Sequence, residues 1–236
     1  MKYISKASPP AELQRWFDQQ PVEEGRRINC GYKQMPSEVK AIVKQRLLDE
    51  QGRLCCYTGR RIDEQSSHIE HFKPQSRCAN HEDVDYNNLL AAFPGDNEKR
   101  KCPYGAHARD NCDESLLVSP LHPSCENSFR FSEYGIIQAV DNSNQRAQET
   151  INRLRLHDQS LTELRRQAIE SALYRKKQPI SPAQLKSIAE QYCLRDKSGN
   201  FFPFCYVIVH AAQELIRKAE RARKRKQAIR SQDSKK

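Results

Sequence analysis

The sequence predicts an α+β fold in which a loop-rich module lies between two helical regions. An amphipathic stretch ends near residue 50, and residues 78–135 are rich in Pro, Asn, Asp, Gly and Cys, as loops with short elements are. Residues 144–177 contain neither Gly nor Pro and carry apolar residues at helical spacing. The expected regions are 1–50, helical; 51–140, the module with its loop extension; and 141–236, basic and helical.

Individual helices are predicted from periodicity and from signals at their ends. The first has apolar residues every four positions after Ser37, a residue type that caps helices well. Another is opened by the pair Ser181-Pro182, a cap followed by a proline at the first helical position. A strand-like RRI at 60–62 and a short apolar segment around Ile69 predict strands. The expected helices are 37–50, about 182–195 and about 204–230.

The composition excludes several classes of protein. No stretch approaches the roughly 18 uncharged apolar residues that a membrane helix needs, and residues 1–10 lack the apolar segment of a signal peptide. The nine cysteines are an odd number at irregular spacing, which argues against a disulfide framework. We therefore expect a cytoplasmic protein whose cysteines are metal ligands or buried thiols.

The net charge of +10 belongs to the C-terminal third of the chain. Residues 1–150 carry 20 basic and 22 acidic side chains, whereas residues 151–236 carry 20 and 8. A solvated helix face is one explanation of this excess, and binding of nucleic acid or of a protein partner is the other. The candidate contact residues are Arg217, Lys218, Arg221, Arg223, Lys224, Arg225 and Lys226.

The segments HIEHFKP at 68–74 and DYNNLLAAF at 85–93 contain the candidate catalytic residues. In the pair Glu70-His71 the carboxylate can bind a divalent metal while the imidazole, whose free pKa lies near neutrality, activates a water molecule. Asn88 is uncharged and can hold that imidazole in place through hydrogen bonds. A Glu-His pair alone carries little information, because surface loops contain many.

With their flanking sequence, these segments resemble the HNH nuclease superfamily, and more specifically the PtuB-like HNH nucleases of Septu and retron antiphage defence systems. The resemblance follows the order LCCYTGRRI, SHIEHFKPQS, DYNNLLAAF, YGAHARDN and LLVSPLHPSCENSFRF, and includes the N-terminal MKYISKASPP. It implies a ββα-metal module, embedded in a mainly helical protein, that cuts DNA, tRNA or other RNA. It also implies a partner ATPase of the ABC or SMC type (PtuA-like) and, in retrons, a reverse transcriptase with its RNA–DNA product.

The resemblance implies roles for individual residues as well. His71 becomes the general base, Glu70 a metal ligand and Asn88 the residue that orients the His71 ring. The ion is expected to be Mg²⁺, with Mn²⁺ or Zn²⁺ as alternatives. His68, three residues before His71, either supports the ligands, contacts a phosphate or is a structural histidine.

The third residue of the HNH triad has two candidates. Asn97 lies at the spacing after Asn88 that modules without insertions show. His107 lies in GAHARDN, which carries the basic residue usual on the metal-binding helix. We favour His107 as the catalytic and metal-binding residue, with Asp110 or Asn111 as a further ligand.

Many HNH modules carry a structural zinc held by two C-x-x-C knuckles, and this sequence departs from that pattern. The second cysteine of each knuckle is replaced, which leaves Cys55 and Cys102. Two thiolates do not fill the tetrahedral site of zinc. Either the zinc has been lost, or Cys56 and Cys112 complete the site from unusual positions.

Two other functions compete with a nuclease. The first is a catalytically inactive HNH scaffold that serves as a nucleic-acid-binding or adaptor subunit, and the second is a regulator stabilised by zinc on the four cysteines. Metal-dependent cleavage of nucleic acid distinguishes a nuclease from both.

Overall fold

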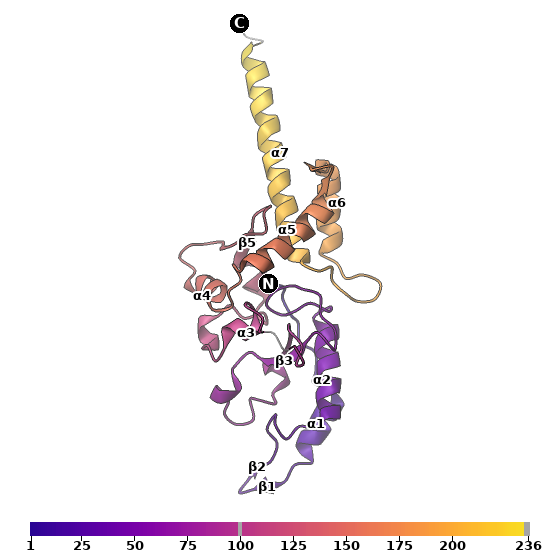
Figure 1. Ribbon diagram of the computed structural model, residues 1–236, viewed down its shortest axis with the longest axis vertical. Coiled ribbons are helices and arrows are strands. Elements are labelled where there is room, and N and C mark those ends of the chain that lie inside the picture. Colours follow the sequence, from indigo (N-terminus) through magenta and orange to yellow (C-terminus); the bar gives the residue numbers. More distant parts are fainter. Residues whose placement is uncertain (99–100, 234–236) are drawn as a thin grey trace.

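The computed structural model describes residues 1–98 and 101–233, and its helices and small antiparallel sheets confirm the α+β prediction (Figure 1). Each sheet is a pair of strands that are adjacent in the sequence. The helices are α1 (Ala11–Asp18), α2 (Ser37–Glu50), α3 (Ala106–Arg109), α4 (Gln145–Arg153), α5 (Gln159–Leu173), α6 (Pro182–Tyr192) and α7 (Cys205–Asp233). The strands are β1 (Val22–Glu23), β2 (Arg26–Arg27), β3 (His68–His71), β4 (Leu89–Ala92), β5 (Phe129–Phe131), β6 (Ile137–Ala139), β7 (Tyr174–Arg175) and β8 (Gln178–Pro179).

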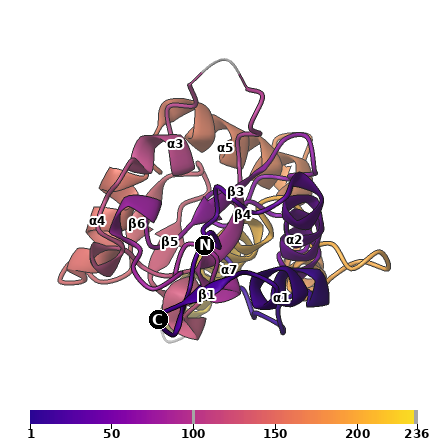
Figure 2. The same cartoon turned by 90° about the horizontal axis from the view of Figure 1, so that it is seen from below.

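Helix α2 has the bounds that its periodicity predicts, but its N-cap is Pro36 and not Ser37, and no side chain caps it. Its buried face consists of Val43, Leu47 and Leu48, and this face packs against β4, all four residues of which are buried. Ile42, beside the predicted stripe, stays 39% exposed. Figure 2 shows β3 and β4 in the middle of the molecule, with α2 on one side and α3 on the other. The strand pair that carries the candidate site therefore rests on a rigid helix.

The stretch 144–177 forms two helices rather than one. A turn separates α4 from α5, and the Asp158 carboxylate accepts hydrogen bonds from the backbone N–H groups of Ser160 and Leu161, which starts the second helix. A hairpin of β7 and β8 then replaces the expected helical end. Helix α6 begins as predicted, with a capping box between Ser181 and Gln184.

The C-terminal helices share one hydrophobic core with the strand module. The backbone N–H of Phe201 donates to Gly52 O at 3.0 Å, and that of Phe204 donates to Gly59 O at 2.8 Å. The first third of α7 is buried, including Val207 and Ala211. These contacts hold the start of α7 against the turn that precedes β3.

Beyond this buried part, α7 runs away from the rest of the molecule as a long single helix (Figure 1). Side chains of α7 are exposed at most positions from residue 217 onwards, as far as they are described. Among the described helices, none is long and apolar enough to cross a membrane.

Candidate functional site

Strands β3 and β4 bring the two candidate segments together. They pair antiparallel with His71 opposite Leu89, and the backbone N–H of Phe72 donates to Asn88 O at 2.9 Å. The residue before β4 therefore lies beside the end of β3. The short helix α3 follows in the chain, so that the elements come in the order strand, strand, helix.

His71 is buried at the end of β3, with 8% of its surface exposed. Its Nε2 lies 2.9 Å from Asp83 O, and Tyr32 meets the ring edge-on with 4.6 Å between ring centroids. A carbonyl oxygen only accepts, so Nε2 carries the proton of the neutral ring and Nδ1 keeps a free lone pair. Burial lowers the pKa of His71, although the Asp83 carbonyl and the Glu70 charge act in the opposite direction. The ring is thus neutral at pH 7, with Nδ1 able to accept a proton.

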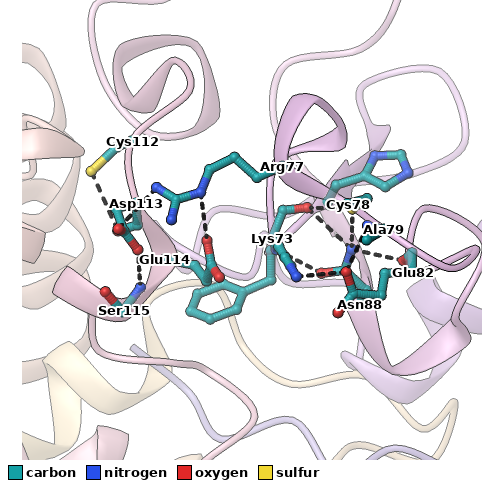
Figure 3. A network of polar contacts seen from close by, with 12 residues as sticks. Lys73, Arg77, Cys78, Ala79, Glu82, Asn88, Cys112, Asp113, Glu114 and Ser115 are labelled. Atoms are coloured by element: carbon teal, nitrogen blue, oxygen red, sulfur yellow. Dashed lines mark hydrogen bonds and ion pairs between the residues drawn. The ribbon is translucent and has the colours of Figure 1, made fainter.

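Asn88 holds the loop between β3 and β4 rather than the His71 ring itself. Its Oδ1 accepts from the backbone N–H of Lys73 at 2.6 Å, and its Nδ2 donates to Lys73 O at 3.1 Å and Glu82 O at 3.0 Å. Figure 3 shows these bonds converging on the Asn88 side chain. Because the adjacent Asp83 supplies the carbonyl that accepts from His71, Asn88 fixes the ring through the loop.

The same loop is also tied to the segment that follows α3. Arg77 forms an ion pair with Asp113 at 2.9 Å and lies 3.8 Å from Glu114 (Figure 3). The loop is therefore held at Lys73 and Glu82 by Asn88, and at Arg77, between them, by this ion pair.

Glu70 faces the opposite side of β3 from His71 and pairs with an arginine of α3. Its Oε1 accepts from Arg109 Nη1 at 2.8 Å and from the Tyr57 hydroxyl at 3.1 Å. Burial by itself would raise the pKa of Glu70, but hydrogen bonding to His68 and the Arg109 charge hold it below its usual value. Glu70 is therefore ionised at neutral pH.

Arg109 links α3 to the end of β3. It is 3% exposed, and besides Glu70 it donates to His71 O at 2.8 Å and to Phe72 O. The sequence pointed to a basic residue on this helix but not to its partners. Those partners lie 37 to 39 positions away in the chain, so no local pattern could reveal them.

His68 shares a face of β3 with Glu70, as the alternation of strand side chains requires. Its Nδ1 lies 2.5 Å from Pro94 O, and its Nε2 lies 3.4 Å from Glu70 Oε2. The hydrogen bonds to Glu70 and to the Pro94 carbonyl outweigh burial and raise the pKa of His68.

The structure separates the two candidates for the third triad residue. His107 lies on α3, and its ring stacks over that of His68 with 6.1 Å between centroids. Asn97 lies in an exposed turn after β4, outside any helix. Asp110 is exposed where α3 has already ended, and Asn111 is exposed beyond it. His107 is thus the candidate that shares a surface with His68 and Glu70.

The cysteines proposed for zinc do not assemble into a metal site. Among the side chains described, those of residues 1–98 and 101–227, no three His, Cys, Asp or Glu groups are close enough to hold an ion by themselves. Cys55 is instead held by hydrogen bonds from Cys56, the Phe93 N–H and Thr58. These bonds outweigh burial and lower its pKa to about 6. The Cys112 thiol donates to the carbonyl of its neighbour Asp113.

The seven cations of α7 differ in their surroundings. Arg217 pairs with Glu214 at 2.6 Å, and Lys218 pairs with Glu133 at 2.8 Å. The other five are exposed and form no ion pair with any side chain that the structure describes. These five are Arg221, Arg223, Lys224, Arg225 and Lys226.

Comparison with known proteins decides the family. The chain is 30% identical over 142 residues to a protein of Vibrio cholerae serotype O1 biovar El Tor named "Retron Vc95 putative HNH endonuclease", covering 58% of this chain and 67% of the relative. The chain belongs to this family of HNH endonucleases. No protein-family model matches it. Membership of the HNH endonuclease family assigns the chain at a coarse level to the nucleases, a class of hydrolases.

Proposed function

We propose that this HNH family member is a metal-dependent endonuclease that hydrolyses phosphodiester bonds of nucleic acid. The observation that carries the proposal is the arrangement at the end of β3. There, Asp83 O binds Nε2 of His71 and leaves Nδ1 free, while Glu70 presents an ionised carboxylate on the opposite face of the strand. His71 is the general base that takes a proton from the attacking water on Nδ1, and Asn88 positions it through the loop.

The donors around Glu70 fit a divalent ion that keeps several non-protein ligands. Glu70 Oε2 faces His68 Nε2 at 3.4 Å, and the His107 ring stacks over that of His68; water and phosphate oxygens complete such a coordination shell. A bound ion supplies charge stabilisation for the phosphate and the leaving oxygen. Mg²⁺ is the ion that the family resemblance favours, with Mn²⁺ and Zn²⁺ as alternatives.

The biological setting proposed for this nuclease is antiphage defence. The named relative is a retron protein, and the sequence resembles PtuB-like nucleases, which supports an ABC- or SMC-type ATPase partner and a retron reverse transcriptase with its RNA–DNA product. The five unpaired cations of α7 supply the charge density for binding nucleic acid or such a partner. Both DNA and RNA are substrates that hydrolysis by activated water permits.

One observation favours the alternative of an inactive adaptor. Arg109 already neutralises Glu70, and a cation must compete with that charge. The double variant Glu70→Gln, His71→Ala distinguishes the two functions, with DNA and RNA substrates, each divalent ion and the ATPase partner present. A nuclease loses cleavage in the variant but keeps binding. If no condition gives cleavage by the wild type and both proteins bind nucleic acid equally, the chain is an adaptor.

A further inference from the structure

We infer that His68 is a direct metal ligand that, paired with Glu70, makes this site prefer a transition-metal ion over Mg²⁺. The inference rests on the proposed function and refines its cofactor. It follows from the geometry of two side chains on one face of β3, from the tautomer that the Pro94 carbonyl imposes, and from the charge that Arg109 places next to the carboxylate.

The first step is the convergence of two donor atoms. His68 Nε2 and Glu70 Oε2 lie 3.4 Å apart, close to the spacing of two neighbouring ligands on one ion about 2.0–2.1 Å from each. Both side chains are about 15% exposed, so that an ion and its waters can reach them. The other oxygen of Glu70 is occupied by Arg109 and Tyr57, so Oε2, which faces His68 Nε2, is the oxygen that can bind an ion.

The second step is the orientation of the imidazole. Pro94 O can only accept a hydrogen bond, so Nδ1 of His68 carries a proton and Nε2 is the atom that faces Glu70. Without an ion, a protonated Nε2 donates to Glu70 Oε2, and a bound ion would take the place of that proton between the two atoms. Metal-binding histidines in proteins are held in the same way, by donation from the other ring nitrogen to a carbonyl. The residue after Pro94 lies close against the segment before β3, because a Cβ on Gly95 would lie 2.0 Å from Gln65 O.

The third step separates His68 from His107. The Nδ1 of His107 accepts the backbone N–H of Cys102 at 3.2 Å, so its Nε2 carries the proton of the neutral ring. His107 can bind an ion through Nε2 only by giving up that bond. His68 keeps its Nδ1 bond to Pro94 O when an ion replaces the proton between Nε2 and Glu70, so it is the imidazole whose backbone hydrogen bond survives metal binding.

The chemistry of this donor set determines the ion. Mg²⁺ prefers oxygen ligands and several carboxylate charges or phosphates, whereas imidazole nitrogen suits Mn²⁺, Co²⁺, Ni²⁺ and Zn²⁺ increasingly well. Glu70 is the one carboxylate of the pair, and Arg109 offsets its charge at 2.8 Å. An imidazole that binds without adding charge thus supplies more of the affinity for a transition metal than for Mg²⁺.

Calorimetric titration of the metal-free, full-length protein with Co²⁺ and with Mg²⁺ tests the inference. The variants are His68→Ala and His68→Gln, which offers an amide oxygen near the position of Nε2, with the exposed His157→Ala as matched control. We expect His68→Ala to lose at least the roughly 10–100-fold in Co²⁺ affinity that even an outer partner of a metal ligand contributes. We expect His68→Gln to lose Co²⁺ affinity while Mg²⁺ affinity changes little, and His157→Ala to match the wild type.

Three results would overturn the inference: a wild type that binds no Co²⁺, unchanged Co²⁺ affinity in a folded His68→Gln variant, or a loss of affinity in His107→Ala but not in the His68 variants. Failure of the proposed function is a separate result. If Co²⁺ affinity depends on His68 but the wild type cleaves no nucleic acid under any condition, the metal site is as inferred and the proposed nuclease function is wrong.

Discussion

Replacing Asn88 by alanine is expected to loosen the loop that positions His71. The change removes three hydrogen bonds of 2.6 to 3.1 Å between the side chain and the backbone of Lys73 and Glu82. At about 1 kcal/mol of net stability for each bond, the free energy of unfolding falls by about 3 kcal/mol. The neighbouring Asn87 is exposed and bonds only within its own turn, to Asp85. Asn87→Ala is therefore a matched control, with an expected change within about 0.5 kcal/mol.

Urea unfolding followed by circular dichroism measures both free energies. A second readout is the nitrogen chemical shifts of the His71 ring, which report which nitrogen carries the proton. In the wild type we expect the proton on Nε2, and in Asn88→Ala a mixture, because Asp83 O is no longer held in place. If Asn88→Ala and Asn87→Ala have equal stability and the His71 tautomer is unchanged, the reasoning about this loop is wrong.

Three further predictions concern charges. Arg109→Met leaves the Glu70 carboxylate without its arginine partner and is expected to lower the free energy of unfolding, measured in urea, by about 3–5 kcal/mol. The control Arg217→Met, in the exposed pair with Glu214, should lower it by at most about 1 kcal/mol. Equal losses in the two variants would contradict the account of Arg109 and Glu70 as a buried pair. Burial lowers the pKa of Lys6 to about 8, although Glu50 acts in the opposite direction. As the pH rises, the folded state therefore loses this proton at a lower pH than the unfolded state does. The free energy of unfolding of the wild type, relative to that of Lys6→Met, should rise by about 2 kcal/mol between about pH 7.5 and about pH 10. A difference that does not change with pH would show that the pKa of Lys6 is not lowered. Changing the five unpaired α7 cations to Gln should reduce the steepness with which log affinity for nucleic acid falls against log salt concentration, by about 0.9 for each lost phosphate contact. The exposed Lys197→Gln is the control. An unchanged slope would show that these cations form a solvated helix face that does not contact nucleic acid.

The parts of the fold that sequence predicts are those with strong local periodicity or end signals. Helix α2 has a regular apolar stripe, and α6 has the Ser181-Pro182 start, so both are predicted at their beginning. The break between α4 and α5 is not predicted, because the turn between Arg153 and the cap residue Asp158 contains neither Gly nor Pro. Hairpins of two-residue strands, such as β1 and β2, are too short to show alternation.

In the candidate site, too, sequence predicts the local features and misses the long-range contacts. Glu70, His71 and Asn88 lie in short segments whose residue types, taken with the flanking sequence and the family resemblance, indicate their chemistry. The contacts of Arg109 with Glu70 and of His68 with Pro94 join positions far apart in the chain. Sequence could name these residues but not their partners, because only the packing of α3 and of the loop after β4 on β3 brings them together.

The most direct test of the central claim is the single-turnover cleavage rate of His71→Ala against the wild type, with a divalent ion and the ATPase partner present. General base catalysis contributes about 10²–10⁴-fold, so we predict a loss of that size with nucleic-acid binding intact. Because His71 is buried at the end of β3, circular dichroism must first show that the variant is folded. A folded His71→Ala variant that cleaves as fast as the wild type would contradict the assignment of His71 as the base.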